Sequence, residues 1–132
     1  MASSLPLRYQ ITQRAVARTS SGKWLWTALS LELCKIIGTR GFESLYLRSL
    51  LRARMQFPWL ASQPQPDGDP LSALGISLEL REPAEAHIAN AALLNIFTDT
   101  LILLIGELIT ERILCAAWGE DLINDIGPEQ QP

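Results

Sequence analysis

The segment from Ala91 to Trp118 most constrains the fold, because it is the most apolar part of the chain and contains no proline. Wound as a helix, it has two rows of side chains at alternating three- and four-residue spacing, which keeps each row on one side. The bulky row consists of Leu94, Phe97, Leu101, Leu104, Leu108 and Cys115. The opposite row consists of Ala92, Asn95, Asp99, Ile102, Gly106 and Thr110. A helix with two such rows packs from two directions, so we predict that it is the central helix.

Helical periodicity also governs the N-terminal half. Large apolar residues recur at helical spacing from Leu25 to Ile36, which predicts a helix over 23–37. Gly38 is placed to end that helix in a left-handed conformation. The linker 38–41 is short, so we expect the next helix, over 42–56, to return antiparallel and to stop at Pro58.

Turn-forming residues divide the two halves of the chain. The segment 61–69 combines prolines, glycine and aspartates and predicts a loop. Residues 70–80 fit both a strand and a helix, and we favour a short helix followed by extended chain. Glu82 and Pro83 are start signals for a long helix that ends at Gly119. That helix runs through Gly106 or kinks there, and close approach of another helix would explain a glycine inside it.

The fold class follows from these segments. A chain of 132 residues fits one domain and is long enough to bury a core. We predict a single all-α domain over 1–132, a bundle of four to five helices around a long central C-terminal helix. The ends, 1–8 and 128–132, are expected to fray.

Charge is distributed unevenly along the chain. Residues 1–60 hold nine basic and two acidic residues, a net +7, whereas residues 61–132 hold two basic and twelve acidic residues, a net −10. One explanation is that the halves face each other, within one fold or across a dimer. The other is that the basic half meets phosphate, in nucleic acid or in anionic lipid.

The sequence contains no catalytic, metal or cofactor motif, so we expect a protein that is not an enzyme and binds no cofactor. His87 is the only histidine, which leaves one possible base and no di-metal pattern. Cys34 and Cys115 lie in apolar helical patterns and are expected to be buried, reduced thiols. Reduced thiols indicate a cytoplasmic protein.

Asp99 is the charged residue that most needs an explanation, because it lies within the row of small residues and a buried carboxylate is costly unless it is paired. We expect it to pair with Arg48 or Arg52, or to form hydrogen bonds across a dimer axis. The residues of this predicted polar latch are Asn95, Asp99, Gly106, Thr110, Arg48 and Arg52.

The same region raises the question of a membrane. The window 91–105 has eleven apolar residues in fifteen, but Asn95 and Asp99 interrupt it. A spanning helix needs about twenty mostly apolar residues. We therefore interpret the window as a buried core helix and keep membrane association through 91–109 as an alternative.

The functional expectation is a non-enzymatic interaction or regulatory module that self-associates as a homodimer. It depends on the two-sided central helix, the uneven charge, and three tryptophans expected to be exposed: Trp24, Trp59 and Trp118. The partner would be another protein or a second copy of this chain. A nucleic-acid-binding regulator that uses the basic half, through arginines such as Arg48 and Arg52, is the second alternative beside the membrane.

Overall fold

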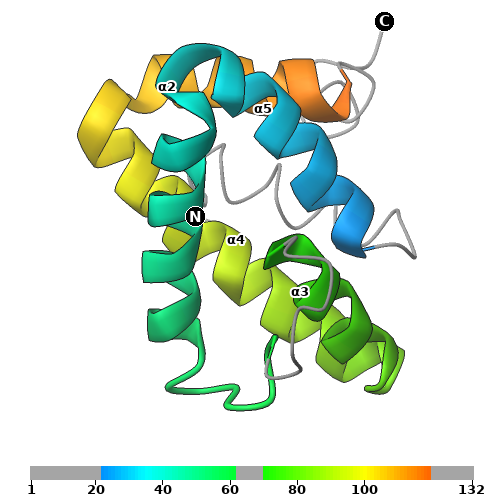
Figure 1. Ribbon diagram of the computed structural model, residues 1–132. Coiled ribbons are helices and arrows are strands. Elements are labelled where there is room, and N and C mark those ends of the chain that lie inside the picture. The colour runs from blue at the N-terminus through cyan, green and yellow to red at the C-terminus, as the bar shows by residue number, and fades with distance from the viewer. Residues whose placement is uncertain (1–21, 62–69, 120–132) are drawn as a thin grey trace, which may run out of the picture.

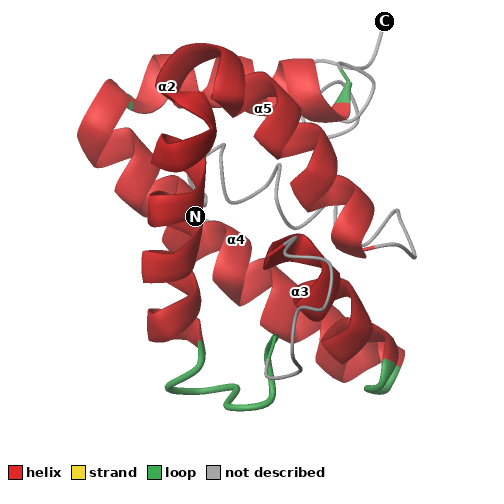
Figure 2. Ribbon diagram, in the orientation of Figure 1, coloured by secondary structure: helices red, strands yellow, loops and turns green. Residues whose placement is uncertain are grey.

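The computed structural model describes residues 22–61 and 70–119, and within them the chain is helical and contains no β-strand (Figures 1 and 2). The helices are α2 (Gly22–Ala53), α3 (Pro70–Glu79), α4 (Pro83–Ile105) and α5 (Glu107–Trp118). The predicted all-α bundle is therefore confirmed. The expected frayed ends and nearly all of the 61–69 loop lie outside the described residues.

Helix α2 is two helical arms joined at Gly38, where φ is 81° and ψ is 165°. This backbone region is open almost only to glycine. The predicted helix over 23–37 is confirmed, but the linker is one residue rather than four. The second arm ends at Ala53 and passes through turns around Pro58. In Figure 1 the second arm returns from the corner in roughly the opposite direction, and the two arms diverge as an inverted V.

Segment 70–80 forms the short helix α3, as the favoured interpretation predicted. Leu71, Leu74 and Leu78 are buried, so the leucines at helical spacing face the core. Gly75 allows α3 to approach the start of α2 closely. A Cβ built at Gly75 would lie 3.1 Å from Cδ of Lys23, so the aliphatic stem of that lysine covers the glycine.

Helix α4 begins as its sequence predicts. Pro83 occupies the first turn, Glu82 before it is extended, and the Ala86 amide donates to the Glu82 carbonyl at 2.8 Å. The helix ends at Gly106, which has φ 92° and ψ 158° and separates α4 from α5. Of the two predicted forms, the interrupted helix is therefore correct. The predicted reason is wrong, because apart from its chain neighbours no atom of the described residues lies within 4 Å of a Cβ built at Gly106. The backbone conformation requires the glycine.

An aromatic cluster fills the space between the V of α2 and α4. The Trp26 ring meets Tyr46 and Phe97 edge-on, with ring centroids 5.3 and 5.1 Å apart, and Phe42 contacts Phe97 at 5.7 Å. Trp26, Tyr46 and Phe97 are completely buried. Edge-to-face pairs of this kind stabilise a core by about 0.5–1.5 kcal/mol each beyond the burial of their area.

The centre of the fold is shared, which corrects the prediction of one long central C-terminal helix. Helix α2 packs against α3, α4 and α5, and α4 in turn packs against α3 and α5. Leu94, Phe97 and Leu101 of the bulky row are buried, but Leu104 and Leu108 beyond them are exposed. The row ends because the chain turns at Gly106.

Candidate interaction surfaces

The predicted latch residues do not form one buried row. Asn95 and Asp99 are half-buried on a flank of α4, Gly106 is exposed, and Thr110 is completely buried. The face of α4 that is buried instead carries Ala86, Ala89, Asn90, Leu93, Leu94, Phe97, Thr98 and Leu101. This face follows helical spacing and is the side that α4 packs against the other described helices.

Two latch residues meet at the corner between α4 and α5. The Thr110 hydroxyl donates to the Gly106 carbonyl at 2.8 Å, and the Thr110 amide donates to the same oxygen at 3.2 Å. Gly106 is the residue before α5, so its carbonyl begins the hydrogen-bond ladder of that helix. The buried threonine therefore fixes the first turn of α5 against the corner.

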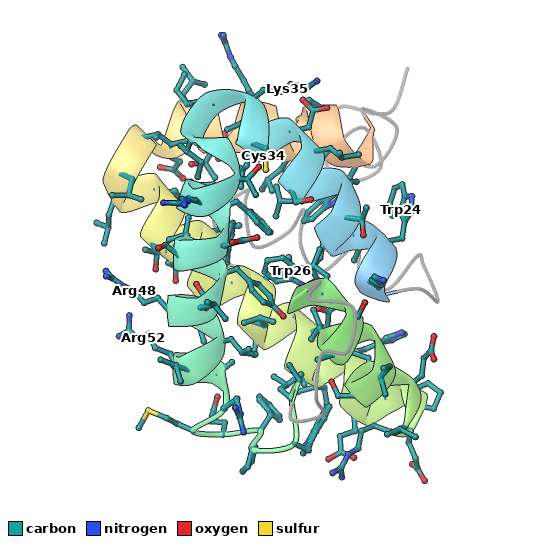
Figure 3. All side chains as sticks on the ribbon, in the orientation of Figure 1. Trp24, Trp26, Cys34, Lys35, Arg48 and Arg52 are labelled. Carbon is teal, nitrogen blue, oxygen red and sulfur yellow. The ribbon has the colours of Figure 1, made fainter. Side chains whose placement is uncertain are left out.

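Arg48 and Arg52 lie on the second arm of α2, are exposed, and project away from the rest of the molecule (Figure 3). The ion pairs between described side chains are Lys35–Glu32 and Arg81–Glu85, at 3.5 and 3.9 Å. The pairing expected between Asp99 and one of these arginines is not among them. A role for Asp99 across a contact between two copies stays a prediction.

The buried polar contacts of the structure involve residues that the sequence analysis did not single out. The Trp26 indole donates to Oδ1 of Asn90 at 2.8 Å, and the Trp118 indole donates to the Leu25 carbonyl at 3.0 Å. Trp118 is buried, so its expected exposure was wrong. Asn90 lies at helical spacing from Leu94 and Phe97, and that spacing was the available signal for its burial.

The other two tryptophans differ from each other. Trp24 is half exposed, as expected, and points away from the bundle (Figure 3). Trp59 is half-buried against the core together with Phe57, and the Arg81 guanidinium lies 4.5 Å from the centre of its ring. This cation–π contact ties the turn after α2 to the turn before α4.

The corner between α4 and α5 carries the most exposed leucine of the described chain. Leu103 is 86% exposed, Leu104 64% and Leu108 62%, and Ile109 is also exposed. These four large apolar side chains lie within seven consecutive residues around Gly106, and we call them the apolar corner. Scattered apolar residues on a surface need no explanation, but a gathered set marks a place of contact.

A second exposed set lies on the second arm of α2. Leu47 and Leu51 are exposed and lie one helical turn apart on the outside of the arm. Met55 is also exposed and lies in the turn that follows the end of the arm at Ala53, and the three side chains together are the apolar strip. Arg40, Arg48 and Arg52 are exposed on the same arm. We call these six residues the basic apolar face.

The described residues contain no group of three or more His, Cys, Asp or Glu side chains that could hold a metal ion. His87 is half-buried near the start of α4. Cys34 and Cys115 are half-buried, not fully buried as expected. This geometry assigns no chemistry to them.

Comparison with known proteins adds no relative: no protein-family model, curated protein or solved structure matches this chain. The functional argument therefore depends on the two surfaces above.

Proposed function

We propose that this protein is a non-enzymatic helical interaction module that self-associates through its apolar corner. The observation that carries the proposal is the exposure of Leu103, Leu104 and Leu108 around the Gly106 turn. Fully burying one leucine side chain contributes about 1.5–3 kcal/mol, so covering several of them can outweigh much of the cost of association.

A second copy of the chain is an occupant that requires no other partner. In a two-fold symmetric dimer the same patch is used on both copies, so each exposed leucine enters the interface once from each copy. The break at Gly106 supports a contact at the apolar corner. The end of α4 carries two of its side chains and the first turn of α5 carries the other two, so both helix ends contribute to one surface. A cytoplasmic location, expected from two cysteines placed in apolar helices, is part of this proposal.

Size-exclusion chromatography with light scattering tests the proposal. We expect the protein to elute at a mass above that of one chain, and the pair of changes Leu104→Ser and Leu108→Ser to return it to one chain. Leu80→Ser is the matched control, because Leu80 is 68% exposed but lies between α3 and α4, away from the corner. A monomeric parent protein, or a double variant that keeps its mass, would contradict the proposal.

Helix α4 supports a second candidate, a membrane-associated component. It is the one helix of the described residues long and apolar enough to cross a membrane, with a mean hydropathy of 1.8, and 39% of that window is buried inside the molecule. Partition between an aqueous and a detergent phase tests insertion. If α4 inserts, the protein is recovered in the detergent phase, and Asp99→Leu increases the fraction recovered there. Recovery of the parent protein and of the Asp99→Leu variant in the aqueous phase would contradict insertion.

A further inference from the structure

The basic apolar face is a second outward surface that self-association through the corner does not use. Its apolar strip lies opposite the core side of the arm, where Phe42, Tyr46 and Ala53 are buried. Met55 is 85% exposed and Leu51 68%, so nothing in the described chain covers the middle and the end of the strip.

Arginines accompany this strip, and acidic side chains hardly do. At 100° per residue, Arg48 and Arg52 follow one edge of the row formed by Leu47 and Leu51 on the arm, and Arg40 lies in line with that row near the Gly38 corner. Glu43 is the one acidic residue between 39 and 56, and it is half-buried. Neither ion pair between described side chains involves any of these arginines.

The shape of the face restricts its partner. It is the outer side of one helix and therefore convex, and Figure 3 shows Arg48 and Arg52 projecting from it. A helix whose leucines are flanked by cationic side chains fits the boundary of a lipid bilayer. The apolar strip enters between headgroups while the arginines stay at the level of the phosphates. Nucleic acid would use the arginines but would leave the apolar strip uncovered.

We propose that the basic apolar face of α2 docks on the surface of an anionic lipid bilayer, with Leu47, Leu51 and Met55 at the acyl boundary and Arg48 and Arg52 on the headgroups. The helix lies on the bilayer and does not cross it. The charge of the arginines selects anionic over neutral lipid, and the apolar strip holds the arm in place. In this proposal, part of the positive charge of the N-terminal half contacts anionic headgroups.

Flotation with vesicles tests this docking on the full chain. The vesicles contain phosphatidylcholine alone, or phosphatidylcholine with about a quarter phosphatidylserine. We expect binding to the anionic vesicles only. Because each arginine near an anionic surface strengthens binding about fivefold, Arg48→Gln with Arg52→Gln should weaken it roughly 25-fold. Leu51→Ser with Met55→Ser should abolish measurable flotation.

Two controls are matched to these variants. Arg112→Gln removes an exposed arginine from α5, and Leu80→Ser removes a leucine as exposed as Leu51. Both should float as the parent does. All variants change exposed side chains, and circular dichroism confirms that each remains helical.

Four outcomes would overturn the docking proposal. The first is equal flotation with neutral vesicles, and the second is flotation that both variant pairs leave unchanged. The third is loss of flotation in the corner variant, Leu104→Ser with Leu108→Ser, together with retention in the arm variants. The fourth is binding of RNA that depends on Arg48 and Arg52 but not on Leu51 and Met55, which would assign the arginines to nucleic acid. Because the corner variant is expected to float normally, failure of self-association and failure of docking give different results.

Discussion

The Gly38 and Gly106 corners have the same backbone conformation but differ in the side chains that are exposed around them. Their φ angles are 81° and 92°, and their ψ angles 165° and 158°. The Gly38 corner is flanked by exposed Thr39 and Arg40, which water solvates, with Ile36 beside them. The Gly106 corner lies between half-buried Ile105 and exposed Glu107, and beyond them exposed leucines and an isoleucine lie on both sides. One glycine therefore only redirects the chain, whereas the other also creates an uncovered apolar surface.

The largest effect on stability is expected at Trp26, which packs between the two arms of α2 that meet at the Gly38 corner. Trp26→Ala should lower the free energy of unfolding by about 3–5 kcal/mol, because it leaves a cavity between Tyr46 and Phe97 and removes the partner of Asn90. Urea unfolding measures it. Trp24→Ala, at a half-exposed position, should cost much less. Equal losses in the two variants would show that the aromatic cluster does not hold the arms together.

The two glycines themselves provide the next comparison. Gly38→Ala and Gly106→Ala should each cost about 1–3 kcal/mol, because alanine is strained in this backbone region. No atom lies within 4 Å of a Cβ at either position, so steric contact adds nothing and the two costs should be similar. Thermal unfolding compares them. A much larger loss of stability in one of the two variants would show that the backbone conformation is not equally strained for alanine at the two corners.

A smaller effect distinguishes the Gly106 corner through its threonine. Thr110→Val removes the hydroxyl that donates to the Gly106 carbonyl and should cost about 0.5–1.5 kcal/mol. Thr100→Val is the control, because the Thr100 hydroxyl donates to the Ile96 carbonyl at 3.0 Å inside continuous helix. We expect a smaller loss there in urea unfolding. A greater loss at Thr100 would remove the special role of Thr110.

The smallest effect is expected from Ile36→Ser at the Gly38 corner. Ile36 is exposed, so the unfolding free energy should change by no more than about 0.5 kcal/mol. Its mass by light scattering should equal that of the parent, in contrast to the variant of Leu104 and Leu108. If Ile36→Ser also dissociates the protein, self-association is not confined to the apolar corner.

Local signals in the sequence predicted most of the helices. The turn residues Gly38, Pro83 and Gly119 mark real boundaries, and the leucines at helical spacing in the first arm of α2 (Leu25, Leu29 and Leu33) and in α3 are buried. The long central helix was overestimated because apolar spacing continues unchanged past Gly106. Composition alone did not show that a glycine at this place would leave the α-helical region and turn Leu104 and Leu108 outward.

The candidate surfaces were harder to predict for a related reason. The row of Asn95 and Asp99 was distinguished by its polarity, but burial depends on where α2 lies across α4, and that is a tertiary property. Asn90 carried the same polarity and is the residue that contacts Trp26. The exposure of Leu47 and Leu51, in contrast, follows from helical spacing, because the core side of that arm is formed by Phe42, Leu45, Tyr46, Ser49, Leu50 and Ala53.

The hydrogen bond from Trp118 to the Leu25 carbonyl has a kinetic consequence. It joins residues 93 positions apart, and the bond from Trp26 to Asn90 spans 64 positions. Small helical proteins fold fast when their contacts are local, but these contacts close most of the chain into a loop and carry the entropy cost of doing so. The first arm of α2 can therefore complete these two contacts only after α4 and the end of α5 have been synthesised.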